Sequence, residues 1–265
     1  MLFNNRVIFT IGKIGFFSYF AKNYYTGNVT NQFITEIFSK DKLINIPKDT
    51  YAIRINYLLS KKLNFEYAYY TSIYNFNLNG LNAFQVTYID SNTNYRLYSW
   101  VNDYNKHLFY YCKHDKCHTL YGGGISIDKS VNENFGLFCK CCFKNPNILL
   151  LCSNKKQLIF QPNFSFLWSI GSQVTGILPY RKKDIFGLAI GQSYANNMFQ
   201  KHKQENKTVF NNNILKQINT NYSETQIELY YNFKLNNYIH ISPIIQYSTN
   251  NTSSFVYVIR TRIIF

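Results

Sequence analysis

The residues whose side chains could coordinate a metal lie in one short segment, Cys112–His118, which holds two cysteines and two histidines. Zinc sites usually combine two pairs of closely spaced ligands. The only candidates for a second pair are Cys139 and Cys141, which would share one face of a strand. The cysteines are irregularly spaced in a chain too long for a typical disulfide scaffold. We therefore predict no metal site and no cofactor.

Two other arrangements could take part in chemistry. The run Gly122–Gly124 could surround a phosphate, but no Lys-Ser or Lys-Thr pair follows it and no helix is predicted there. Glu224 and Glu228 lie four residues apart, on one face of a strand, and glycosidases use paired carboxylates that flank the scissile bond. The glycine run can instead be a turn before a strand, and the two glutamates can be part of the polar face of a strand. We adopt these two interpretations and predict that the protein is not an enzyme.

The elements that carry these residues are strands, because apolar and polar residues alternate with a period of two. In the last segment, Phe255–Phe265, the odd-numbered residues are apolar except for a threonine, and Arg260 and Arg262 lie on the other face. The segment Glu224–Leu235 alternates in the same way. Its length of about 12 residues exceeds the usual strand of a soluble sheet and is enough to cross a membrane.

The same pattern predicts about a dozen strands and almost no helix. Only Asn236–Asn237 separates two of these strands, as in a tight hairpin, whereas the polar stretch 196–221 predicts a long loop. Long loops at one end and short turns at the other are typical of outer-membrane barrels. The further predicted strands are Arg6–Ile14, Tyr51–Leu59, Phe65–Thr71, Ala83–Ile89, Tyr95–Val101, Gly123–Asp128, Phe135–Phe143, Gln157–Trp168, Ser172–Leu178, Ile185–Ser193 and Tyr238–Ser248.

Two features favour a membrane barrel over a soluble β-sandwich. The apolar strand faces carry Tyr and Phe near the strand ends, as the aromatic girdles of a barrel would. The polar faces carry Glu, Arg, Lys and Gln, whose charges cost little in a water-filled lumen. No run of 18 or more apolar residues is present, so no spanning helix is predicted. We predict an all-β, transmembrane antiparallel barrel.

The charge of +15 in 265 residues usually indicates a nucleic-acid partner or an anionic membrane. The chain also contains 24 Tyr and 23 Phe. Tyr, Phe, Ile, Asn and Lys have AT-rich codons, so a biased genome explains part of both the aromatic content and the lysine excess. We therefore predict no nucleic-acid partner, and we interpret the lysines of 201–207 as part of a solvated loop.

Six segments follow one another in the order and spacing of a known family. They contain Gly12, Lys13, Phe20, Asn23, Tyr24, Gln32 and Phe33; Pro47 and Asp49; Arg96 and Trp100; the strand–turn–strand 123–141; Gly176, Arg181, Asp184 and Gly187; and Glu228, Pro243, Gln246 and Phe265. This series resembles the carbohydrate-selective porins of Gram-negative bacteria, the OprB-type family. Ala52 and Lys140 stand where that family usually has Gly and Arg.

The resemblance implies that residues 1–265 form a single porin-like domain. The family's members are longer, with barrels of about 16 strands, so we expect the signal peptide and the opening strands to be absent. The N-terminal residues also lack the apolar segment and cleavage site of a signal peptide. Two alternatives stay open: a narrower closed barrel of about 12 strands, or a sheet that is incomplete without another piece.

The function that the resemblance implies is passive diffusion of carbohydrates and other small polar solutes through the outer membrane. An inward-folded loop would constrict a polar lumen, and Phe265 would be the signal that the outer-membrane assembly machinery reads. The implied partners are these solutes, the lipid bilayer, that machinery and, in a homotrimer, two further copies. The candidate pore-lining residues are Asn23, Gln32, Asp49, Arg96, Trp100, Arg181, Asp184, Gln226, Glu228, Gln246, Arg260 and Arg262.

Three other functions remain open. The chain could be a structural outer-membrane β protein, or a remnant of a porin, that no longer conducts. It could be a soluble β-sandwich that binds glycans or nucleic acid through its positive charge and aromatic side chains. A carbohydrate-active enzyme is the weakest alternative, because the sequence has no signal for a paired acid and base.

Overall fold

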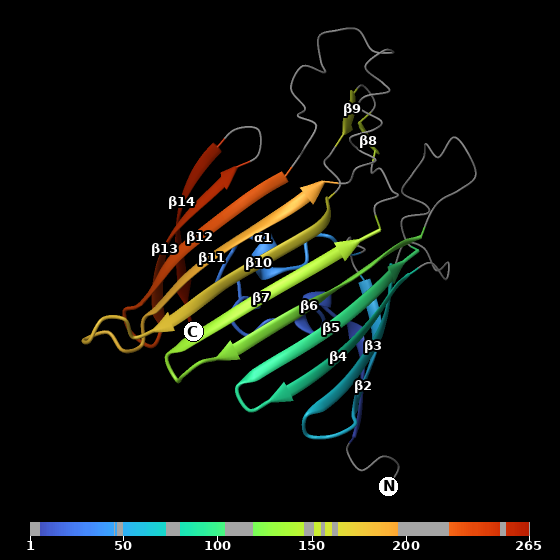
Figure 1. The fold of residues 1–265 in the computed structure, drawn as a ribbon, viewed down its shortest axis with the longest axis horizontal. Helices are drawn as coiled ribbons and strands as arrows, with labels where there is room; N and C mark the ends of the chain where they lie inside the picture. The colour runs from blue at the N-terminus through green and yellow to red at the C-terminus, as the bar shows by residue number, and fades with distance from the viewer. Residues whose placement is uncertain are drawn as a thin grey trace.

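The computed structural model describes residues 6–44, 46, 50–72, 80–103, 119–145, 151–154, 157–160, 164–195, 223–249 and 253–264. Its main element is a single sheet of 12 strands, in which every neighbouring pair is antiparallel (Figure 1). The strands of this sheet are β1 Val7–Lys13, β2 Thr50–Leu58, β3 Leu63–Ser72, β4 Leu81–Asp90, β5 Thr93–Asn102, β6 Leu120–Ser130, β7 Phe135–Lys144, β10 Phe164–Thr175, β11 Ile185–Ala195, β12 Ser223–Lys234, β13 Ile239–Thr249 and β14 Ser253–Ile263.

The remaining described elements are small. A separate hairpin is formed by β8 (Leu151–Asn154) and β9 (Gln157–Phe160). A 3-10 turn, η1 (Phe16–Ser18), and a short helix, α1 (Glu36–Ser39), lie between β1 and β2. None of the described helices has the length and apolar character needed to cross a membrane.

The strands follow one another around the sheet in chain order, so each connection joins neighbours. At one end the connections are the turns 59–62, 91–92, 131–134, 176–184 and 235–238. At the other end the connections are 14–49, 73–80, 103–119, 145–163, 196–222 and 250–252, and four of these six are longer than every connection at the first end. The predicted all-β fold, with its antiparallel strands and its long connections on one side, is therefore confirmed. The predicted loop 196–221 lies outside the described residues.

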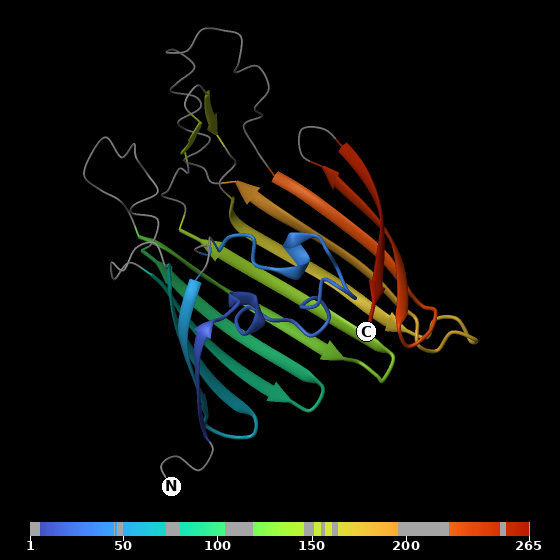
Figure 2. The same ribbon diagram turned by 180° about the vertical axis from the view of Figure 1, so that it is seen from behind.

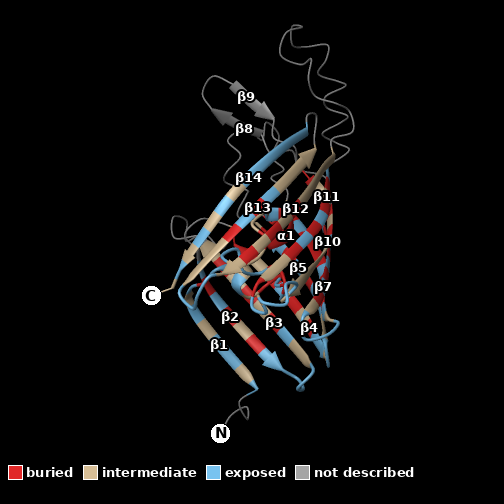
Figure 3. Ribbon diagram, turned by 90° about the vertical axis from the view of Figure 1, so that its left-hand side faces the viewer, coloured by how far each residue is buried: buried red, intermediate tan, exposed pale blue. Residues whose placement is uncertain are grey.

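The two faces of the sheet differ as the alternation predicts. On the convex face apolar side chains are exposed: Ile259 is 77% accessible and Ile11 75%. On the concave face polar and charged side chains are buried, among them Asp128 at 2% and Glu228 at 0%. Figure 3 shows buried positions, in red, among exposed and intermediate ones along the strands. Soluble proteins rarely expose so much contiguous apolar surface. A lipid environment outside and a protein interior inside explain both faces, and this distribution speaks against the soluble β-sandwich.

Exposed aromatic side chains gather on the convex face near both ends of the strands. Tyr88 and Tyr95 lie opposite each other beside the short turn 91–92, with ring centroids 6.2 Å apart. Toward the other end, Phe166 and Tyr194 are paired with centroids 5.8 Å apart. Aromatic rings prefer the two membrane–water interfaces, so these pairs have the positions expected of girdle residues.

One predicted boundary was wrong. The sequence suggested two strands, Gln157–Trp168 and Ser172–Leu178, whereas β10 runs continuously from Phe164 to Thr175. Gly171 does not end the strand. A Cβ at Gly171 would lie 2.5 Å from the Phe138 ring, so the glycine allows close packing inside a strand.

The sheet has two edges within the described residues. There β1 pairs only with β2, and β14 pairs only with β13. Since the strand number is even, β1 and β14 run in opposite directions, as an antiparallel closure requires. An unpaired edge exposes backbone polar groups that lipid cannot satisfy. We therefore expect both edges to be paired in the membrane, either with each other or with another piece of chain.

Candidate functional site

The segment Ile14–Ile44, which we call the inner loop, enters the concave side of the sheet and lies across it (Figure 2). It follows β1 at the long-connection end and carries η1 and α1. Its contacts reach Asp128 and Asn232, close to the short-turn ends of β6 and β12. Within the part of the chain that the structure describes, the inner loop is the segment that covers the concave side of the sheet.

An apolar core fixes the inner loop to the wall. Phe20, Phe33, Ile37 and Phe38 of the loop are fully buried. The ring of Phe33 lies 5.5 Å from Phe38 and makes edge contacts with two wall residues. Burial of large apolar side chains is the main source of stability in such a contact. The wall residues of this core include Ala68, Tyr70, Leu81, Ala83, Trp100, Leu120, Phe138, Leu167, Tyr230 and Ile244.

A glycine in the wall lets the inner loop approach closely. A Cβ at Gly136 of β7 would lie 1.9 Å from the ring of Tyr25 in the loop. Such a distance is impossible for a real side chain, and Tyr25 is buried. Gly136 therefore allows the phenol ring of Tyr25 to lie directly on the strand.

Polar side chains of β2, β3 and β4 hold the beginning of the inner loop. Glu66 is ion-paired with Arg54 and accepts a hydrogen bond from Gln85 Nε2 at 2.8 Å. Gln85 Oε1 accepts one from the backbone N–H of Ala21 at 2.9 Å. The Arg54 guanidinium also lies over the ring of Tyr19, 4.2 Å from its centroid. The buried carboxylate of Glu66 thus orients the side-chain amide of Gln85, and that amide binds the loop backbone at Ala21.

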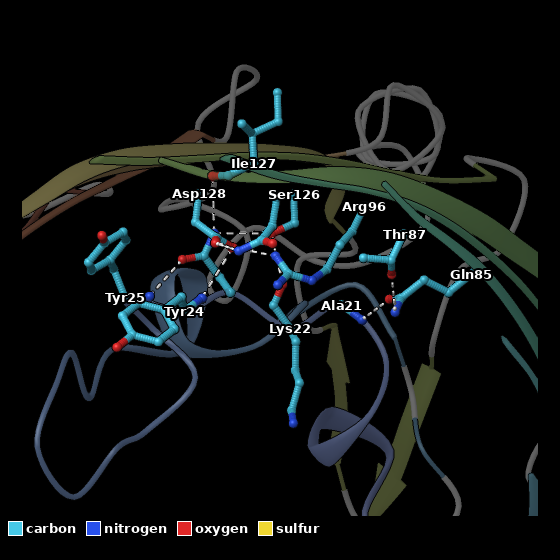
Figure 4. Close-up of polar contacts among 12 residues, drawn as sticks. Ala21, Lys22, Tyr24, Tyr25, Gln85, Thr87, Arg96, Ser126, Ile127 and Asp128 are labelled. Carbon is cyan, nitrogen blue, oxygen red and sulfur yellow. Dashed lines mark hydrogen bonds and ion pairs between the residues drawn. The ribbon is translucent and has the colours of Figure 1, made fainter. Parts of the chain in front are cut away.

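A second polar group, on β5 and β6, holds the next turn of the loop (Figure 4). Asp128 is ion-paired with Arg96 and accepts a hydrogen bond from the backbone N–H of Tyr24 at 3.2 Å. Asn23 donates to Ser126 Oγ at 3.1 Å, and Ser126 Oγ donates to the carbonyl of Lys22 at 2.9 Å. The wall side chains among these, Arg96, Ser126 and Asp128, all come from the polar faces of β5 and β6.

The carboxylate of Glu228 in β12 binds the loop just before α1. Its Oε1 and Oε2 accept hydrogen bonds from the backbone N–H groups of Ile34 and Thr35, both at 2.8 Å. Gln246 of β13 donates to Thr35 Oγ1 at 2.8 Å and to Glu228 at 3.2 Å. A carboxylate that receives two backbone N–H groups is a strong anchor, because both bonds are charge-assisted.

Charged residues also surround the end of the inner loop. Lys140 Nζ donates to the carbonyl of Phe38 at 2.5 Å. Asp41 accepts a hydrogen bond from the hydroxyl of Tyr98 at 2.9 Å. Burial raises the pKa of Asp41 above its usual value, because the carboxyl loses its hydration. Lys42 and Glu224 form an ion pair of 2.9 Å.

The two arginines of β14 bind the far side of the loop. Arg260 Nη1 donates to the carbonyls of Val29 at 2.7 Å and Gln32 at 2.6 Å. Arg262 Nη1 donates to the side-chain oxygen of Asn31. The loop is therefore held at both sides of the sheet, by β2–β6 and by β12–β14.

Arg181 and Asp184 occupy a different place, the short turn between β10 and β11. They form an ion pair, and Asp184 also accepts from the backbone N–H of Lys234 at 3.0 Å and the hydroxyl of Tyr231 at 3.1 Å. Although burial by itself acts in the opposite direction, these partners lower the pKa of Asp184 below its usual value. The pair fixes the turn 176–184 to the end of β12.

We expect Asp184→Asn to reduce stability by about 1–2 kcal/mol at pH 7, the value of a charge-assisted bond with a partly exposed partner. Because the pKa of Asp184 is lower in the folded protein than in the unfolded chain, where it is about 3.9, the ionised carboxylate stabilises the fold above that pH. This stabilisation is lost as the pH falls through the pKa that Asp184 has in the folded protein. The difference between wild type and variant should therefore shrink below about pH 4. Urea unfolding of the detergent-refolded proteins at several pH values measures this difference in stability. A difference that stays constant with pH would contradict the lowered pKa of Asp184.

The structure places all candidate pore-lining residues except Asp49, which lies outside the described residues, as does Phe265. Arg96 and Trp100 belong to the wall, with Trp100 buried in the core. Gln226, Glu228, Gln246, Arg260 and Arg262 lie on the concave face, and Asn23 and Gln32 lie in the inner loop. These residues do not gather at one point: most form contacts between loop and wall, and Arg181 and Asp184 form the turn contact.

Several residues of this arrangement were missed from the sequence. They are Glu66, Gln85, Asp128, Asp41, Tyr98 and Lys140. The wall residues among them share one signal: each lies on the inward face of a strand whose outward face is apolar. The segment Cys112–His118 lies outside the described residues, and Cys139 and Cys141 are free thiols on the convex face.

This site has the features of a channel wall with a constriction loop, formed by buried ion pairs and backbone anchors. The description "Carbohydrate-selective porin, OprB family" belongs to the family model that matches residues 149–254. The resemblance seen in the sequence is therefore confirmed over that part of the chain. No curated protein sequence matches this chain.

Solved outer-membrane proteins have the same fold. The high-pH structure of Pseudomonas putida OprB matches with a TM-score of 0.75 at 13% identity, covering 99% of this chain and 70% of that one. Its low-pH structure matches with a TM-score of 0.56 at 12% identity, over 98% and 63% of the two chains. The outer-membrane channel DcaP of Acinetobacter baumannii matches with a TM-score of 0.53 at 12% identity, over 97% and 70%. The fold is that of an outer-membrane porin, and an integral location in the outer membrane is supported.

Proposed function

We propose that this porin-fold chain forms an outer-membrane pore through which carbohydrates and other small polar solutes diffuse passively. The observation that carries the proposal is the inner loop, which is anchored by buried polar side chains inside a sheet whose outer face is apolar. A loop in this position would narrow the lumen of a closed barrel. The family description of residues 149–254 supports carbohydrates as the solute class.

Planar-bilayer conductance of residues 1–265, refolded in detergent, tests the pore. We expect steady current steps that added sugars reduce, because a sugar in the constriction displaces ions. A protein that is β-rich and detergent-bound but electrically silent would contradict the proposal. That outcome would favour the second candidate, a structural outer-membrane β protein, for which the two sheet edges of the described residues are the specific observation.

We expect the pore to prefer anions. Arg260 and Arg262 lie on the concave face, where they donate to neutral oxygens of the loop, and no carboxylate among the described residues forms an ion pair with either. The net charge of the chain is also positive. A reversal potential measured in a KCl gradient gives the preference, and clear cation selectivity would show that this expectation is wrong.

Two further proposals concern partners. Assembly into a homotrimer stays a prediction, which chemical cross-linking of the refolded protein in detergent can decide.

Recognition of Phe265 by the assembly machinery is also a prediction, because this residue lies outside the described part of the chain. Deletion of Phe265 should reduce the amount of folded protein in the outer membrane and leave refolding in detergent unchanged.

A further inference from the structure

Three basic side chains form one row across neighbouring strands near the short-turn end of the sheet. Lys234 of β12 lies opposite His240 of β13, and His240 lies opposite Arg262 of β14. All three are even-numbered and lie on the concave face with Glu228 and Arg260. Adjacent strands are about 4.8 Å apart, so the whole row spans about 10 Å. Arg260 lies one inward-facing position further along β14.

The nitrogen atoms of this row are short of partners. Both ring nitrogens of His240, and Nε and Nη2 of Arg260, are buried without a hydrogen-bond partner among the described residues. Buried donors without partners are costly, and native proteins usually satisfy them with a side chain, water or a bound ligand. His240 and Arg260 therefore offer unpartnered nitrogens at one place, between the charges of Lys234 and Arg262.

The nearby carboxylates are already engaged. Asp184 binds Arg181, the backbone N–H of Lys234 and Tyr231. Glu228 binds the inner loop through both of its oxygens. Lys234 and Arg262 lie on either side of His240, about 10 Å apart, so their like charges repel each other. An anion beside His240 would reduce this repulsion and accept hydrogen bonds from free donors at the same time.

We propose that the row Lys234–His240–Arg262, together with Arg260, is a binding subsite for the carboxylate or phosphate group of a small solute. Arginine and lysine are the side chains best suited to these groups. Arg260 and Arg262 also hold the inner loop, so the subsite lies where the loop meets the wall, toward the short turn 235–238, and a solute would meet it at the edge of the constriction. The inference deepens the proposed pore function, on which it rests, by naming the charge of a preferred solute.

Isothermal titration calorimetry of the refolded full chain in detergent, with glucose 6-phosphate and glucose as matched probes, tests the subsite. We expect glucose 6-phosphate to bind about tenfold more tightly than glucose, the effect of one charge-assisted hydrogen bond. Lys234→Gln and Arg262→Gln should each remove most of this difference. Lys62→Gln, an exposed lysine on a turn at the same end of the sheet, is the control with the same change of charge and should have no effect.

Lys234→Gln is the decisive variant, because Arg262 also binds the inner loop and its replacement could disturb folding. Equal affinities for the two probes, or an equal loss in Lys62→Gln, would overturn the subsite. The titration does not require conduction, so the two proposals can fail separately. Binding by an electrically silent protein would support the subsite and contradict the pore. A conducting protein that does not distinguish the probes would contradict the subsite alone.

Discussion

Phe33→Ala is expected to destabilise the folded protein by about 3–5 kcal/mol, the usual cost of removing a fully buried aromatic ring. Phe33 has no accessible surface. Its ring lies 4.9 Å from Tyr230 of β12 and 5.5 Å from Phe138 of β7, in edge contacts with two strands that β10 and β11 separate in the sheet. The substitution would leave a cavity between the inner loop and the wall, so the ring's contacts with the loop and with the strands would be lost together.

Urea unfolding of the protein refolded in lipid vesicles measures this change. The control is Phe9→Ala, which removes the same atoms from the exposed outer face of β1. Lipid tails can fill the space left by an outward ring, so no cavity remains and the loss should be less than half as large. Equal losses for the two variants would mean that the inner loop does not form a packed core.

Glu228→Gln is expected to free the middle of the inner loop and to cost about 2–4 kcal/mol, the range for leaving a buried charged contact unmatched. The side chain is fully buried, and its two oxygens accept from Ile34 and Thr35. A glutamine has one oxygen and one NH2 group. Its amide would place a donor against a backbone N–H, so one buried donor would have no acceptor. Gln246 would also lose one of its two acceptors.

Single-channel recording distinguishes this effect from a simple loss of stability. A loop released at Ile34–Thr35 should widen the constriction, so the conductance of Glu228→Gln should be larger and noisier than that of the wild type. Glu133→Gln, in an exposed turn, changes the charge equally and should conduct as the wild type does. Wild-type conductance and stability in Glu228→Gln would mean that this carboxylate does not hold the loop.

Much of the fold could be predicted because alternation is a local property. The two faces of a strand are fixed by the backbone, so the sequence alone placed Glu228 and Arg260 on one side and Ile259 and Tyr257 on the other. The exposure of these residues in the structure agrees with that division. The break expected near Gly171 failed, because a glycine in a strand can serve either as an interruption or as a place of close approach.

The site was predicted less completely than the fold. The sequence identified Arg96, Glu228, Gln246 and Arg260 as lumen residues, but as side chains that solutes would meet. In the structure they hold the inner loop. Water and a loop backbone can both satisfy an inward-facing charge, and nothing in the alternation distinguishes between them.

The sequence by itself determined which residues face lipid and which face inward, since that depends only on the parity of positions along each strand. The tertiary structure alone decided the partners of the inward residues. Glu228 and Ile34, which form one hydrogen bond, are separated by 194 positions. Their meeting depends on the curvature of 12 strands and on the path of the inner loop, and both arise from packing over the whole chain. For the same reason the basic row of Lys234, His240 and Arg262 emerged only when strand register brought three separate segments side by side.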